Sequence, residues 1–86
     1  MDKHIIIGVH ITERVKHAGD VQAVFTKFGC QIRTRLGLHE AREDLCSPNG
    51  VILLEMVDDD AKVDEMISQL NEIEGIETKK MVFDHP

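Results

Sequence analysis

The fold is decided by residues 51–57, which read Val51-Ile52-Leu53-Leu54-Glu55-Met56-Val57. Every residue of this run except Glu55 is apolar. A strand that is apolar on both faces is typical of the middle of a sheet, where both faces are covered. The run therefore predicts a central strand, and it requires something to pack on each of its two faces.

The residues that follow this strand predict a helix and a final strand. Asp58-Asp59-Asp60 provide N-cap candidates and negative charge at a helix N-terminus. The apolar residues that recur at helical spacing after them are Val63, Met66, Ile67, Leu70 and Ile73. Gly75 ends this helix, and residues 76–83 form a strand whose alternation is broken around Lys79-Lys80, where we predict a bulge.

Two more strands are predicted by alternation of apolar and polar residues. Within residues 4–12, one side carries Ile5, Ile7, Val9 and Ile11, and the other carries His4, Ile6, Gly8 and His10. Within residues 31–40, one side carries Ile32, Thr34, Leu36 and Leu38, and the other carries Arg33, Arg35, Gly37 and His39. We expect the isoleucine-rich side of the first strand to face the helices.

Residues 15–28 have the apolar spacing of a helix between these two strands, and Gly29 follows as its C′ residue. Gly19 lies inside this stretch and costs up to about 1 kcal/mol relative to Ala in a helix interior. The pattern therefore leaves two starting points open, one at Val15 and one near Asp20 with residues 17–19 as an entry turn.

The order of elements is β-α-β-β-α-β, which predicts an α+β, ferredoxin-like fold with two helices on one face of a four-stranded antiparallel sheet. The other face is left open. It receives the outward residues of the third strand and, we expect, Val82, and it is too apolar to face water. We therefore predict that this face packs against another copy, in a homodimer or homotetramer.

Composition narrows the range of functions. A chain of 86 residues and 9.7 kDa is one domain, and a chain of this size buries only about 60% of its unfolded surface. The net charge of −6 and the pI near 5.2 disfavour direct binding of nucleic acid. No apolar run approaches the roughly 20 residues that span a bilayer, so we expect a cytoplasmic protein with no membrane partner. Cys30 and Cys46 are read as reduced thiols.

Residues 17–32, His17-Ala18-Gly19-Asp20-Val21-Gln22-Ala23-Val24-Phe25-Thr26-Lys27-Phe28-Gly29-Cys30-Gln31-Ile32, resemble the core signature of ACT and ACT-like regulatory domains. In that signature one glycine opens the first helix and another precedes the second strand. With residues 32–40, Cys46, Gly50 and residues 51–55, nearly the whole chain is similar to the small iron-only hydrogenase system regulators. The resemblance implies a single ACT-like domain over residues 1–86, oligomers built from sheets, and a regulatory role in the cytoplasm.

Two groups of residues are candidates for binding a small ligand. His10, Thr12 and Gly19 are expected near the end of the first strand and the start of the first helix, where ACT-like domains present a ligand cavity at subunit contacts. Arg33 and Arg35 are expected on the same side as His39, where a guanidinium fork suits a carboxylate or phosphate. Each group has a structural alternative, since arginines on an edge strand also pair with acids and discourage aggregation.

His39 and Cys46 form the sharpest candidate pair for a metal, because imidazole and thiolate suit zinc, nickel, copper or iron. A tight site needs three or four ligands, and His10 of a neighbouring copy is a candidate for another. No residue pattern points to nucleophilic catalysis or to phosphate loops. The main hypothesis is a non-enzymatic regulatory module that senses a small ligand at a subunit contact, and the alternative is a metal-binding sensor or carrier. The sequence does not specify a cofactor.

Overall fold

The computed structural model describes residues 3–12, 14–38 and 50–84, and it confirms the predicted order of elements. Strand β1 (His4–Ile11) leads into helix α1 (Arg14–Lys27). A short 3-10 helix (Gly29–Gln31) leads into β2 (Ile32–Leu38). Strand β3 (Gly50–Met56), helix α2 (Asp60–Asn71) and β4 (Ile76–Phe83) complete the ferredoxin-like α+β fold.

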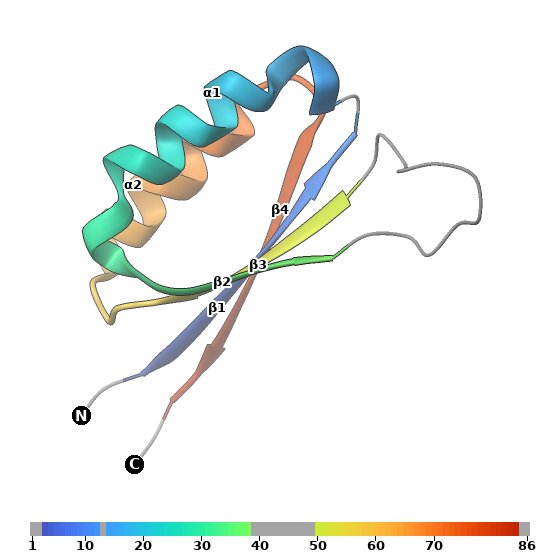
Figure 1. Ribbon diagram of the computed structural model, residues 1–86. Helices are drawn as coiled ribbons and strands as arrows, with labels where there is room; N and C mark the ends of the chain where they lie inside the picture. Colours follow the sequence, from blue (N-terminus) through green and yellow to red (C-terminus); the bar gives the residue numbers. More distant parts are fainter. Residues whose placement is uncertain (1–2, 13, 39–49, 85–86) are drawn as a thin grey trace.

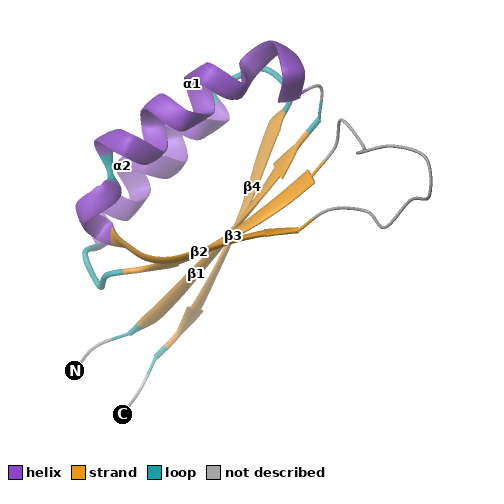
Figure 2. Cartoon of the chain, viewed as in Figure 1, coloured by secondary structure: helices purple, strands orange, loops and turns teal. Residues whose placement is uncertain are grey.

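The sheet has the order β2-β3-β1-β4, and every neighbouring pair is antiparallel. The prediction that residues 51–57 form a central strand is confirmed, since β3 lies between β2 and β1. Figure 1 shows both helices on the same face of this sheet, and Figure 2 shows the resulting two layers of helix and strand. We call the face opposite the helices the open face.

The core lies between the helices and the sheet. The sheet contributes the predicted side of β1 together with Leu54 and Met56 of β3, and all are buried. The helices contribute buried residues at helical spacing, namely Val21, Val24, Phe25, Phe28, Val63, Met66 and Leu70. Burial of these side chains is the main favourable term in folding, at about 25 cal/mol per Å² of apolar surface removed from water.

Both helices differ slightly from the sequence prediction at their ends. Helix α1 begins at Arg14, so Gly19 lies inside it and does not form an entry turn. Helix α2 begins after the N-cap residue Asp59, whose side chain accepts a hydrogen bond from the Lys62 backbone N–H at 3.2 Å. Among the described glycines only Gly75 has a positive φ, of 88°, so Gly29 is not a left-handed C′ residue.

The bulge lies in β2 and not, as predicted, at Lys79-Lys80 of β4. The pairing of β1 with β4 continues without a shift from His4 to Ile11, whereas the pairing of β2 with β3 shifts between Ile32 and Thr34. The alternation of β4 breaks for another reason. Lys80 is on the helix side, and its ammonium reaches Asp64 of α2 at 3.0 Å.

The open face exposes large apolar side chains, as predicted, although not all of the predicted ones. Leu36, Met81 and Phe83 are each at least half exposed. Val82 is paired with the buried Ile5 and so lies on the helix side, which corrects its placement on the open face. Neither helix of the described residues is long and apolar enough to cross a membrane.

Candidate functional site

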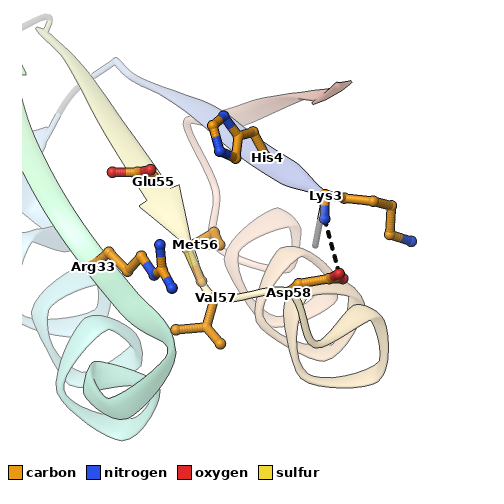
Figure 3. A pocket seen from close by; sticks show the side chains of 7 residues that line it. All are labelled: Lys3, His4, Arg33, Glu55, Met56, Val57 and Asp58. Atoms are coloured by element: carbon orange, nitrogen blue, oxygen red, sulfur yellow. Dashed lines mark hydrogen bonds between the residues drawn. The ribbon is translucent and has the colours of Figure 1, made fainter. Parts of the chain in front are cut away.

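A small pocket lies at the end of the sheet where β1 and β2 begin and β3 ends (Figure 3). Its volume is about 140 Å³. Its lining residues come from these strand ends and from the loop that leads into α2, and they are Lys3, His4, Arg33, Glu55, Met56, Val57 and Asp58. Pockets for drug-sized ligands run from roughly 300 to 1,000 Å³, so this one suits only a small molecule or ion.

The bulge in β2 places Arg33 beside this pocket. Ile32 is opposite Met56 and Thr34 is opposite Glu55, so Arg33 is the additional residue between them. A bulge of this kind bends the strand and redirects a side chain. Figure 3 shows the Arg33 side chain extending beside the end of β3, next to Met56 and Val57.

Beyond the bulge, Arg35 follows the regular alternation of β2. Arg35 is opposite the buried Leu54 and therefore lies on the helix side. Its guanidinium lies 4.8 Å from the centre of the Phe25 ring and donates to Gln22 Oε1 at 3.4 Å. The structure does not bring the two arginines together, because Arg35 contacts Phe25 and Gln22 while Arg33 lines the pocket.

The two acids of the pocket already hold neutral donors. The Thr34 hydroxyl donates to Glu55 Oε1 at 3.1 Å. The backbone N–H of Lys3 donates to Asp58 Oδ2 at 2.9 Å, as Figure 3 shows. Arg33, in contrast, has no hydrogen bond or ion pair with any other residue in the described part of the chain. Its guanidinium is therefore available to an anion.

A surface ion pair stands beside the pocket. The Lys3 ammonium donates to Asp60 at the start of α2. This hydrogen bond, together with the attraction between the charges, raises the pKa of Lys3 above its ordinary value and lowers the pKa of Asp60 below its own. The pair fixes residue 3 to the helix and so helps to shape one wall of the pocket.

The structure separates the first group of predicted ligand residues. His10 is exposed on the open face, opposite Glu77. Both the Thr12 backbone N–H and its hydroxyl donate to the Gly75 carbonyl at 2.9 Å. Gly19 is an exposed residue of α1, which covers the other face of the sheet. Thr12 thus joins the end of β1 to the start of β4.

The metal candidates His39 and Cys46 lie outside the described residues, so metal binding by this pair stays a prediction. Within residues 3–12, 14–38 and 50–84, the structure has no cluster of three or more metal-ligating side chains. Cys30 is a free, exposed thiol.

Sequence reasoning selected Arg33 but missed most of the other pocket residues, above all Glu55. One signal was present in the sequence, since Glu55 is the only polar residue in the apolar run 51–57. A carboxylate at such a position needs a reason, because a charge in an apolar setting is costly unless it is paired.

The chain is similar in structure to the uncharacterized protein TM1266 from Thermotoga maritima, with a TM-score of 0.81. The two chains are 20% identical, and the match covers 98% of this chain and 100% of that one. The sequence matches no protein-family model and no curated protein. This similarity supports the ferredoxin-like fold over almost the whole chain.

Proposed function

We propose that this protein is a small non-enzymatic regulatory module that oligomerises through its open face and senses a small anionic ligand at the subunit contact. The observation that carries the proposal is the pocket at the margin of this face, where the guanidinium of Arg33 has no partner among the described residues. A free guanidinium fork is suited to a carboxylate or a phosphate.

The size and charge of the pocket limit the ligand. About 140 Å³ holds a few water molecules or one small organic acid. Glu55 and Asp58 are also on the wall, so a ligand with a positive or hydrogen-bond-donating group beside its anionic group is favoured over a bare polyanion. A small carboxylic acid with a second polar group fits this description.

The open face supports oligomerisation. Leu36, Met81 and Phe83 are 53%, 55% and 50% exposed, and clusters of exposed apolar side chains mark interaction surfaces. The resemblance to ACT-like domains and to iron-only hydrogenase system regulators supplies the biological setting of the proposal, in which the module acts on a hydrogenase system through another protein.

Thermal unfolding tests the ligand. A ligand that binds only the native state stabilises it by RT ln(1 + [L]/Kd), about 2.7 kcal/mol at 100 times Kd. We expect at least one member of a panel of phosphate, acetate, small hydroxy acids and amino acids to raise the melting temperature of the wild-type protein.

Two arginine variants decide where that ligand binds. Arg33→Ala is expected to abolish the shift, and Arg35→Ala is the matched control because Arg35 lies on the helix side with Gln22 and Phe25. A shift that persists in Arg33→Ala contradicts the site, and the absence of any shift in the wild-type protein contradicts ligand sensing.

A further inference from the structure

The side chains of the open face are segregated into four corners. One apolar corner lies on β2 and β3 and consists of Leu36, Val51 and Leu53. The other lies on β1 and β4 and consists of Ile6, Met81 and Phe83, with His4 opposite Phe83 at its end. Leu36 is opposite Leu53, and Leu53 is opposite Gly8 of β1. Ile6, two residues before Gly8 on β1, is opposite Met81. The two apolar corners therefore lie on one diagonal of the open face, on either side of Gly8.

The two remaining corners are charged. The pocket corner carries Glu55 and Thr34, which are opposite each other at the start of β2 and the end of β3, and Glu55 lines the pocket. The far corner carries Glu77 and Lys79, together with His10, at the start of β4 and the end of β1. Lys79 and Glu77 lie 3.7 Å apart. The pocket corner therefore carries an anion, and the far corner carries a cation beside an anion.

We propose that two copies stack open face to open face with their strands crossing at close to 90°, about a two-fold axis along the apolar diagonal. Orthogonal crossing is one of the two standard ways in which sheets pack. About this axis each apolar corner meets its own counterpart, Leu53 on Leu53 and Ile6 on Ile6. The pocket corner then meets the far corner of the second copy, with Glu55 facing Lys79.

Aligned stacking, the other standard packing, is disfavoured by the same layout. A two-fold axis parallel to the strands places Ile6 over Glu55 of the second copy. A two-fold axis perpendicular to the strands, in the plane of the sheet, places Leu53 over the same Glu55. Either arrangement buries a carboxylate against an apolar side chain, which is costly unless the charge is paired. The strands must therefore cross.

The second diagonal axis is disfavoured by charge. It brings the pocket corner onto its own counterpart, so Glu55 faces Glu55 across the dyad. Like charges at an interface cost several kcal/mol. Of these four two-fold arrangements, only the apolar diagonal combines apolar contact with opposite charges.

This arrangement rests on the proposed function and sharpens it, because the second copy then covers the pocket corner. Lys79 of that copy lies over the margin of the pocket beside Glu55. A small anion bound at Arg33 would thus sit between the two copies and gain Lys79 as a second cation. Ligand binding and assembly are coupled in this geometry.

A charge swap tests the crossing without any ligand. Glu55→Lys and Lys79→Glu each place like charges opposite one another, so each variant is expected to raise the dimer dissociation constant at least about ten-fold, which is 1.4 kcal/mol. The double variant restores opposite charges and is expected to return the constant to within about three-fold of the wild-type value. Sedimentation velocity over a range of concentrations measures all four proteins.

Arg35→Glu is the matched control, because it replaces a cation by glutamate as Lys79→Glu does but on the helix side. A wild-type protein that stays monomeric overturns the oligomerisation in the proposed function. The crossed geometry alone is overturned if the wild-type protein dimerises but the single variants leave the dissociation constant unchanged, or if the double variant does not restore it.

Discussion

The two faces of the sheet are formed by the same strands, but they differ in burial and in the distribution of charge. Leu54 points to the helices and is fully buried, whereas its neighbour Leu53 points to the open face and is only partly covered. The covered face is apolar throughout its centre, and the open face alternates apolar and charged corners. Packing inside one chain requires only apolar volume, whereas recognition between copies also requires charges at defined positions. The covered face therefore determines stability, and the open face is suited to selecting a partner.

The largest expected effect compares the neighbours Leu54 and Leu53. Leu54→Ala removes a fully buried side chain from a core that cannot collapse completely, so we expect a loss of about 2–5 kcal/mol in the free energy of unfolding. Leu53→Ala is expected to cost much less in the monomer and instead to weaken dimerisation. Urea unfolding at low protein concentration, together with sedimentation, separates the two effects. Equal losses of monomer stability would show that the two faces do not differ as described.

The next expected effect on stability compares Gly75, in the turn before β4, with Gly19, inside α1. Gly75 has a φ of 88°, and a Cβ added there would lie 2.6 Å from the Thr12 carbonyl oxygen. Gly75→Ala is therefore expected to destabilise the protein by about 1–3 kcal/mol, the usual cost of a strained backbone position. This loss should not depend on protein concentration, because the joint between β1 and β4 lies within one chain.

Gly19→Ala is the opposite case and serves as the control. A Cβ at Gly19 has no heavy atom within 4 Å, and the residue lies inside α1. The substitution is expected to stabilise the helix by about 0.5–1 kcal/mol, because Ala has the higher helix propensity. Thermal unfolding measures both variants, and a destabilising Gly19→Ala would contradict the placement of this residue in the helix.

The covered face could be predicted from the sequence because it depends on periodicity alone. Alternation in residues 4–12 and helical spacing in residues 15–28 and 63–73 locate the core directly, since burial on one side repeats every second residue in a strand and every third or fourth in a helix. The fourth strand was predicted with the bounds that the structure shows.

The candidate site was predicted only in part, because it depends on breaks in periodicity. The register shift beside Arg33 has no signal in the residues of β2, yet it places Arg35 on the helix side, opposite the buried Leu54. The broken alternation of β4 suggested a bulge that does not exist, because Lys80 spans the gap to Asp64. The grouping of Lys3, His4 and Asp58 with Glu55 depends on the meeting of three strand ends, which composition does not reveal.

The smallest expected effect concerns the ion pair of Lys3 and Asp60, which belongs to neither face and borders the pocket. The folded-state pKa of Asp60 lies below its ordinary value of 3.8, so its contribution is complete above that pH and is lost as the pH falls through the lower folded value. The folded-state pKa of Lys3 lies above 10.5, so its contribution is complete below that pH and is lost as the pH rises through the higher folded value.

Asp60→Asn removes the pair, and the difference in melting temperature between this variant and the wild-type protein should therefore be constant across neutral pH and shrink in strong acid. Both side chains are partly exposed, so the difference should be small and should fall further in high salt, which screens exposed charges. Glu74→Gln controls for the loss of one negative charge at an exposed position. A difference that grows as the pH falls below 3.8 would contradict the lowered pKa. The pair also borders the pocket, so Asp60→Asn is expected to weaken the ligand-induced shift in melting temperature. It should do so without changing the dissociation constant of a dimer built on the open face.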